Sequence, residues 1–290
     1  MSDHRPRRSV LYMPSSNEKA LDKARTIPAD ALIFDLEDAV APDAKPAARD
    51  NAVAAAASGA YGNREVTIRC NGLDTPWGAD DLAAAARSGA SAVVIPKIDS
   101  VRALDAVAAG LDAAGAPTSM GIWAMVETPT AILDVRSIAA HPRVAVLVMG
   151  TNDLAKELRA TQVRGRAPLF PHLATALLAA REAGKSILDG VFNDVKDLDA
   201  FREECVQGAQ MGFDGKTLIH PTQVEVANDV WAPSEADVEY ARRVIAAFEE
   251  AVAEGRGVIT VDGRMIENLH VDNARRTLAT QAAIEALSAG

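Results

Sequence analysis

With 290 residues, 49% of them hydrophobic, the chain is long enough to bury the core of one large α/β domain or of two modest ones. Forty acidic residues against 30 Lys and Arg give a net charge of −10, which argues against nucleic acid or an anionic membrane surface as the main partner. Small-molecule ligands are expected instead. Its two cysteines, Cys70 and Cys205, are far apart in the sequence, so no disulfide framework is expected.

The amino terminus predicts no export or membrane insertion. Its basic residues are not followed by an apolar run of signal-peptide length, and no later stretch approaches the roughly 20 residues of a membrane span. We therefore expect a cytoplasmic protein without a membrane partner.

Short apolar segments typical of buried strands recur along the chain with helical segments between them. There are eight, at residues 9–14, 31–40, 65–71, 92–98, 121–128, 144–153, 186–192 and 213–220. Near-continuous apolar strands fit a parallel sheet covered on both faces, and eight of them predict a closed (β/α)8 TIM barrel. A doubly wound open sheet is the alternative fold, but MPSSNEKA after the first segment lacks the glycine-rich dinucleotide fingerprint.

Helix-start residues precede several of the intervening segments. Ser16 and Asn17 stand before EKALDKAR, Pro46 before AARDNAVAAA, and Thr128 with Pro129 before TAILDVRSIAA.

The pattern changes after Pro221, where a long helix (about 234–255), a short ITVDGRMI segment and a final helix (about 271–288) are predicted. We divide the chain into a catalytic barrel domain (1–232) and a C-terminal helical extension (233–290). The last part of the extension is too small to hold its own core, so it is expected to pack on the barrel or on a neighbouring subunit.

Charged and polar residues follow most of the predicted strands, at the end where parallel barrels carry their active sites. They are Asp35, Glu37 and Asp38 after the second strand, Arg69 and Asn71 after the third, Lys97 after the fourth, Glu127 after the fifth, and Asn152 and Asp153 after the sixth. Carboxylates that converge on one mouth repel each other unless a cation lies among them.

Glu127 and Asp153 are the candidate metal ligands, because they end neighbouring strands only about 4.8 Å apart. An octahedral Mg2+ site commonly uses one or two carboxylates and leaves its other positions to water and substrate. Either acid alone could equally be a helix cap or a surface charge.

Arg69 is the candidate for holding a substrate carboxylate in two-point contact. The alternative is a structural ion pair with Glu37, and both can hold at once, because a carboxylate that orients the guanidinium is a usual supporting arrangement. Asp35 and Asp38 could provide hydrogen-bonding support or contact a ligand directly.

Several motifs resemble the HpcH/HpaI aldolase and citrate lyase beta-subunit-like family, which includes malyl-CoA and citramalyl-CoA lyases. They are RRSVLYMPSSN, FDLEDAV, IRCNG, VIPK, VETPTAIL, MGTNDLA and GKTLIHPTQ, in the family's order and within residues 7–276. The resemblance implies Mg2+, or Mn2+ in its place, held by Glu127 and Asp153. It also implies that Arg69 grips the carboxylate of a 2-oxo acid such as glyoxylate or pyruvate.

The resemblance also implies a path for coenzyme A. Lys23 matches a coenzyme A-binding lysine of the first helix, Tyr12 lines the same path, and Ile219 with His220 matches another substrate-contacting stretch. Backbone amides around Asn152 are candidates for stabilising the thioester oxygen.

A catalytic aspartate of the family lies in the C-terminal extension, which acts there as a lid on a neighbouring subunit. This chain has Glu267 at the matching position, in GRMIEN. Glu267, Arg69 and Glu37 form the predicted catalytic set, and the resemblance implies a homo-oligomer, a trimer or a hexamer.

The predicted activity is Mg2+-dependent cleavage of the carbon–carbon bond in a 3-hydroxyacyl-CoA such as malyl-CoA or citramalyl-CoA, which gives acetyl-CoA and glyoxylate or pyruvate. The longer side chain of Glu267 keeps a second reaction open, hydrolysis of the thioester. A third possibility is a citrate lyase beta subunit that works on a citryl thioester within a larger assembly.

Overall fold

A computed structural model describes residues 5–255 and 257–289 of the chain. The chain divides into two compact units, one of residues 7–230 and the other made mainly of the residues from Trp231 onward. Each unit is described by itself. Within the described ranges, no helix has both the length and the apolar character that crossing a bilayer requires.

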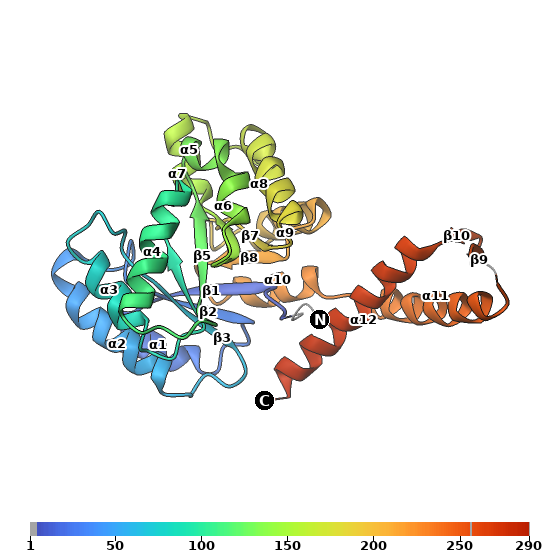
Figure 1. Cartoon of the computed structure of the whole chain (residues 1–290), viewed down its shortest axis with the longest axis horizontal. Coiled ribbons are helices and arrows are strands. Elements are labelled where there is room, and N and C mark those ends of the chain that lie inside the picture. The colour runs from blue at the N-terminus through green and yellow to red at the C-terminus, as the bar shows by residue number, and fades with distance from the viewer. Residues whose placement is uncertain (1–4, 256, 290) are drawn as a thin grey trace. The chain divides into compact units, whose positions relative to one another are not determined.

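The first unit is a closed barrel of parallel strands with helices around it, which confirms the predicted (β/α)8 fold (Figure 1). Neighbouring strands pair in sequence order, and β1 also pairs with β8, so the sheet has no free edge. The strands are β1 (Ser9–Pro14), β2 (Ala31–Asp35), β3 (Glu65–Arg69), β4 (Ala92–Ile95), β5 (Gly121–Val126), β6 (Val144–Met149), β7 (Ser186–Asp189) and β8 (Gly215–Leu218).

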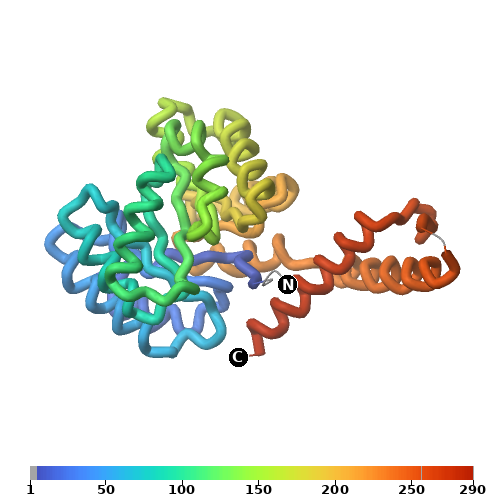
Figure 2. The backbone as a smooth tube through the Cα atoms, viewed as in Figure 1, coloured from blue at the N-terminus to red at the C-terminus, as the bar shows by residue number. Residues whose placement is uncertain are grey.

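Helices connect successive strands and form the outer layer, as the backbone trace in Figure 2 also shows. They are α1 (Glu18–Ala24), α2 (Lys45–Ala57), α3 (Gly78–Ala85), α4 (Val101–Ala113), α5 (Pro129–Leu133), α6 (Val135–Ala140), α7 (Thr151–Leu158), α8 (Phe170–Glu182), α9 (Leu198–Met211) and α10 (Gln223–Trp231), with short 3-10 turns η1 (Pro42–Ala44) and η2 (Ala167–Leu169).

The predicted helix starts are largely correct. Asn17 caps α1, because its side chain accepts a hydrogen bond from the backbone N–H of Ala20, and Thr128 caps α5 in the same way. The single helix predicted after Pro129 is wrong, since the chain breaks at Asp134 into α5 and α6.

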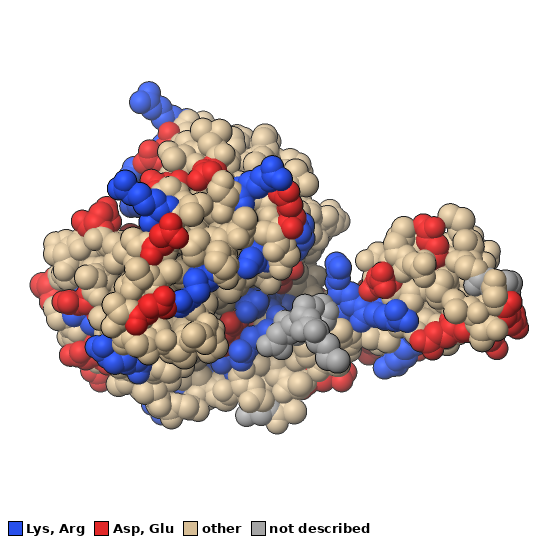
Figure 3. Space-filling view, in the orientation of Figure 1, with Lys and Arg blue, Asp and Glu red and all other residues tan. Residues whose placement is uncertain are grey.

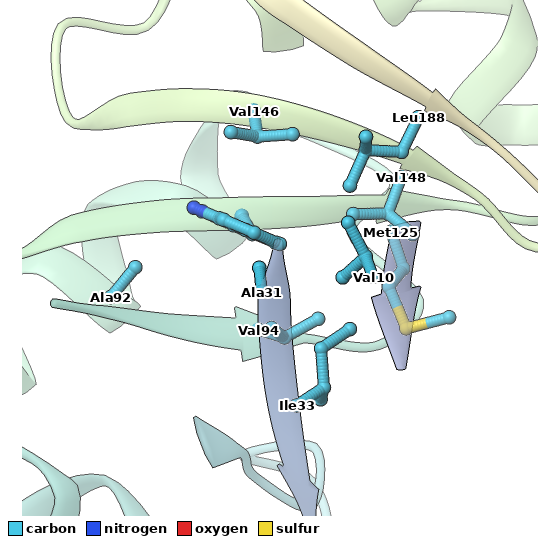
Figure 4. Close-up of a cluster of buried hydrophobic side chains, with 10 residues drawn as sticks. Val10, Ala31, Ile33, Ala92, Val94, Met125, Val146, Val148 and Leu188 are labelled. Atoms are coloured by element: carbon cyan, nitrogen blue, oxygen red, sulfur yellow. The ribbon is translucent and has the colours of Figure 1, made fainter. Parts of the chain in front are cut away.

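The barrel interior is filled by side chains from alternate positions of the strands. Val10, Ala31, Ile33, Ala92, Val94, Trp123, Met125, Val146, Val148 and Leu188 form one buried apolar cluster (Figure 4). Side chains two residues apart on a strand lie on the same face of the sheet, so Ala31 and Ile33 both point inward. Tyr12 packs against this cluster.

The second unit contains α11 (Glu235–Ala253), the two-stranded β9 (Ile259–Val261) and β10 (Arg264–Ile266), and α12 (Asn268–Ser288). Asp262 and Gly263 join the two strands with positive φ values of 49° and 77°, as a two-residue hairpin turn requires. The last part of the extension packs against α11, and the three elements share one core. Buried residues of α11, the hairpin and α12 form one apolar cluster: Ala241, Val244, Phe248, Val261, Ile266, Val271 and Ala274.

Basic and acidic side chains are intermingled on the face of the molecule drawn in Figure 3. Much of the surface charge is paired in this way, for example Arg136 with Glu182 and Arg164 with Glu203.

Candidate active site

A cavity of about 400 Å3 lies at the carboxyl ends of the barrel strands, directly above the apolar filling of the barrel. We call it the mouth pocket. Six of the predicted site residues line it: Tyr12, Arg69, Glu127, Asn152, Asp153 and Ile219. Met125 belongs both to its lining and to the apolar cluster, so the pocket floor is the top of the barrel core.

Glu127 follows β5 directly and is 3% exposed. One carboxylate oxygen, Oε1, accepts a hydrogen bond of 2.7 Å from the backbone N–H of Lys97, a residue held at φ 50°. The pKa of Glu127 is raised to about 7, mainly by burial and also by the charge of Asp153, against the lowering effect of the Lys97 N–H. The pocket therefore holds this carboxylate under an electrostatic penalty that a bound cation would relieve.

Asp153 lies in the first turn of α7, not at the end of a strand as the sequence predicted. β6 ends at Met149, and α7 begins two residues later. In the part of the chain that the structure describes, the Asp153 carboxylate has no hydrogen-bond or ion-pair partner. It is therefore free to bind a ligand in the mouth pocket.

Gly150 allows the start of α7 to lie close to the end of β5, where Glu127 is. A Cβ at this position would collide with the Glu127 side chain. The backbone N–H of Gly150 donates to the Val126 carbonyl of β5 at 3.0 Å, which fixes the start of α7 beside Glu127.

The residues of the pocket fit a hard divalent cation. Residues 5–255 and 257–289 contain no cluster of three or more His, Cys, Asp or Glu side chains suited to a metal, so a site here would rest on two carboxylates. Two carboxylates, with water and substrate oxygens in the other positions, is the donor set that suits Mg2+. Glu127 and Asp153 are the residues that would hold it.

Asp35 holds the guanidinium of Arg69 in a bidentate ion pair. Its Nε and Nη2 donate to the two oxygens of Asp35 at 2.6 and 2.7 Å, while Nη1 lies 2.7 Å from Glu37 Oε2. The guanidinium also stacks over the Tyr12 ring at 4.7 Å. Asp35 and Glu37 thus provide support, and the N–H groups that both leave unused remain for a ligand carboxylate.

Glu37 pairs with Arg69 and does not line the pocket. Burial raises its pKa to about 7, although Arg69 lowers it, and Asp38 adds to the rise. The ion pair between Arg69 and Glu37 therefore exists together with the bidentate contact to Asp35.

The pocket lining includes the first three residues of α7, Thr151, Asn152 and Asp153, whose backbone N–H groups begin the helix. These positions have no intrahelical acceptor, and no side chain caps this helix. Such N–H groups carry the positive end of the helix dipole and favour a negatively charged ligand atom.

Besides Glu37, two predicted site residues of the first unit lie outside the mouth pocket, and one belongs to the second unit. Lys23 lines a separate groove between α1 and α2. His220 is exposed, with its Nδ1 bonded to Thr222 Oγ1 at 2.8 Å. Glu267 belongs to the second unit, where it is the N-cap residue of α12 and its N–H donates to His270 Nδ1 at 3.2 Å.

Sequence reasoning missed a buried charge cluster below the pocket, which we call the β7–β8 network. Asp189, the last residue of β7, accepts from Arg166 at 2.6 Å and from Lys216 at 2.8 Å, and Lys216 also reaches Glu204 at 2.8 Å. Burial alone would raise the pKa of Asp189, but Lys216 and Arg166 lower it overall. Thr217 Oγ1 donates to the Asp189 carbonyl and lines the mouth pocket.

A second cavity of about 570 Å3 adjoins the mouth pocket. The segment between α7 and η2 and the start of α9 line it, including Arg164, Arg166 and Gln207. Thr151, Asn152, Val191 and Asn193 line both cavities and so form the wall between them.

Fold and pocket together define a (β/α)8 barrel with a polar site at the carboxyl ends of its strands, where barrel enzymes have their active sites. The site holds the acid pair Glu127 and Asp153 together with Arg69, which is ion-paired with Asp35 and Glu37. The chain belongs to the HpcH/HpaI aldolase/citrate lyase family, because residues 8–221 match the model of that family. The predicted family membership is confirmed.

Curated relatives match almost the whole chain. A (3S)-malyl-CoA thioesterase of Cereibacter sphaeroides (strain ATCC 17025 / ATH 2.4.3) is 51% identical over 284 residues, which cover 98% of both chains. The citrate lyase subunit beta of Escherichia coli (strain K12) is 36% identical and covers 95% of this chain and 93% of its own.

A solved structure is similar over nearly the same length. CitE from Mycobacterium tuberculosis, in complex with magnesium, acetoacetate and coenzyme A, has a TM-score of 0.79 and 28% identity, covering 96% of this chain and 99% of its own.

Proposed function

We propose that the chain is a Mg2+-dependent enzyme that acts on a 3-hydroxyacyl-CoA of the malyl-CoA type and cleaves its carbon–carbon bond. The observation that carries this proposal is the acid pair Glu127 and Asp153, which share the mouth pocket with Arg69 and form no ion pair with a Lys or Arg side chain among the described residues. Magnesium and coenzyme A in the similar CitE structure support the assignment of both to this chain.

The barrel residues divide the work on such a substrate. When bound by Glu127 and Asp153, Mg2+ supplies a Lewis acid for the hydroxyl and carboxylate oxygens of the substrate. Arg69 binds the substrate carboxylate through the N–H groups that Asp35 and Glu37 leave free, and these two carboxylates keep the guanidinium oriented.

Cleavage breaks the bond between the carbinol carbon and the carbon next to the thioester, and the electron pair passes into the thioester as an enolate. The N–H groups at the start of α7 stabilise the negative oxygen that results. The hydroxyl proton needs an acceptor, and Glu267 of the C-terminal extension remains our predicted one.

Thioester hydrolysis is the second candidate reaction. It is favoured by the 51% identical relative, which is a (3S)-malyl-CoA thioesterase. The same acid pair, arginine and α7 amides serve a reaction in which water adds to the thioester carbonyl and coenzyme A leaves as a thiol.

One assay separates the two reactions. The purified chain is incubated with (3S)-malyl-CoA and Mg2+, and glyoxylate and free thiol are measured on the same sample. Cleavage releases glyoxylate and acetyl-CoA without free thiol, whereas hydrolysis releases one thiol per substrate without glyoxylate. Absence of both products, with citramalyl-CoA as well, would overturn the proposal.

The path of coenzyme A and the subunit arrangement remain predictions. Lys23 lies with Lys19 along the groove between α1 and α2, where the acidic Glu18 and Asp22 also lie, and its ammonium group is our predicted contact for a phosphate. Replacement of Lys23 by Ala is expected to raise KM for the thioester and leave kcat unchanged. We also propose a homo-oligomer in which the extension of one subunit covers the pocket of another, which light scattering on the purified chain tests first.

A further inference from the structure

We propose that Asn193, in the loop after β7, is a positioning residue that holds the first turn of α7 against the mouth pocket through Asn152. This inference rests on the proposed function, because the turn carries Asp153 and the N–H groups that would meet the substrate. No motif that identified the pocket includes Asn193.

The contact is a reciprocal pair of side-chain amides. Asn152 Nδ2 donates to Asn193 Oδ1 at 3.0 Å, and Asn193 Nδ2 donates to Asn152 Oδ1 at 2.8 Å. Gln162 Nε2 donates to the same Asn152 oxygen at 3.3 Å. Each amide thus offers a donor and an acceptor to the other, an arrangement that fixes the orientation of both side chains.

The pair links two elements that both shape the pocket. Asn152 is the second residue of α7, next to Asp153, while Asn193 follows the β7 strand end. A second contact lies beside it, since Gly190 packs so closely on Thr151 that a Cβ there would collide with the threonine side chain. Rotation of the α7 turn about its axis would break the amide pair and this packing together.

Among the described residues, the first turn of α7 has few other contacts that fix its orientation. No side chain caps α7, and at its N-terminal end the Gly150 N–H anchors the backbone on the Val126 carbonyl. A carboxylate and three N–H groups that act together must keep one orientation relative to Glu127. Asn193 supplies that restraint from the solvent side, in the wall between the two cavities.

The test is Asn193→Ala, with Lys196→Ala as the matched control on the same loop. We expect Asn193→Ala to lower kcat on malyl-CoA roughly tenfold and leave KM unchanged, because supporting residues act on the reacting geometry more than on substrate binding. Mn2+ affinity, measured by calorimetry without substrate, should weaken roughly tenfold as well. Lys196→Ala should behave as the parent chain in both measurements.

A double-mutant cycle with Asn152→Ala shows whether Asn193 acts through Asn152. If it does, Asn193→Ala has no additional effect on Mn2+ affinity or kcat once Asn152 is already alanine. Full additivity, or a rise in KM alone, would mean a direct substrate contact and would overturn the proposal. Parent-like kcat and Mn2+ affinity in a folded Asn193→Ala, with its melting temperature as the check, would overturn it too.

The two proposals fail in different ways. If the parent chain turns over no hydroxyacyl thioester, the proposed function fails, and the Mn2+ affinities of the four chains in the cycle still decide the role of Asn193. If the parent is active and the cycle is additive, only the positioning role fails.

Discussion

The barrel contains two groups of charged side chains, the β7–β8 network and the acid pair of the mouth pocket, and they differ in whether the charges are paired. In the β7–β8 network, Asp189 has both Lys216 and Arg166 within hydrogen-bond distance. In the mouth pocket, Glu127 accepts a hydrogen bond from the backbone N–H of Lys97, and the charge of Asp153 raises its pKa. Burial of a charge is tolerated when a partner compensates it, so the charges of the network are matched within the fold, whereas Glu127 and Asp153 form no ion pair among the described residues and remain for a ligand.

The largest effect on activity should come from removing the charge of Glu127 in the mouth pocket. Glu127→Gln keeps the shape of the side chain but takes away a metal ligand, and we expect activity to fall roughly a thousandfold, as loss of several kcal/mol of Lewis-acid stabilisation implies. Unfolding by urea without metal should show equal or higher stability, because a buried uncompensated carboxylate is gone. Comparable turnover in the variant and the parent would contradict the metal site.

The opposite response is expected in the β7–β8 network. Asp189→Ala leaves Lys216, which is fully buried, without its main partner, and we expect a loss of about 3–5 kcal/mol in the free energy of unfolding. Urea titration monitored by circular dichroism measures this loss. If Asp189→Ala proved as stable as Glu127→Gln, the contrast between the two groups of charges would be wrong.

The strand pattern explains why the fold and half of the site were predictable. Eight apolar runs predict a barrel, and the rule that function gathers at strand carboxyl ends selects Glu127 and Arg69 from sequence alone. The break at Asp134 was not predictable, because buried Ile132, Val135 and Ile138 continue the helical spacing straight through it.

The network and the α7 turn were missed for different reasons. Asp189 and its partners Arg166 and Lys216 are 23 and 27 residues apart, and Lys216 lies inside a short strand, so no local pattern relates them. Asp153 was assigned to a strand because the apolar run before it is unbroken and α7 starts without a capping side chain.

A smaller effect should follow from filling the space beside Glu127. Gly150→Ala places a methyl group against the Glu127 side chain, so its carboxylate must shift from its present position. We expect Mg2+ affinity to weaken roughly tenfold, measured by calorimetry. Gly257→Ala, where nothing lies within 4 Å of the added Cβ, is the control. Unchanged affinity in Gly150→Ala would mean that this carboxylate oxygen does not contact the metal.

The smallest effect concerns acid stability and depends on the lowered pKa of Asp189. A carboxyl group whose pKa is lower in the folded than in the unfolded chain contributes stability that is complete above its unfolded pKa, about 4, and is lost as the pH falls through its folded value. The parent chain should therefore lose free energy of unfolding below about pH 4, and Asp189→Asn should lose less over the same range. Urea titrations at pH 3 to 6 compare the slopes, with Glu203→Gln as the control because that carboxylate pairs with Arg164 on the surface. Parallel curves for the parent chain and Asp189→Asn would show that Asp189 is not held in its charged form by Lys216 and Arg166.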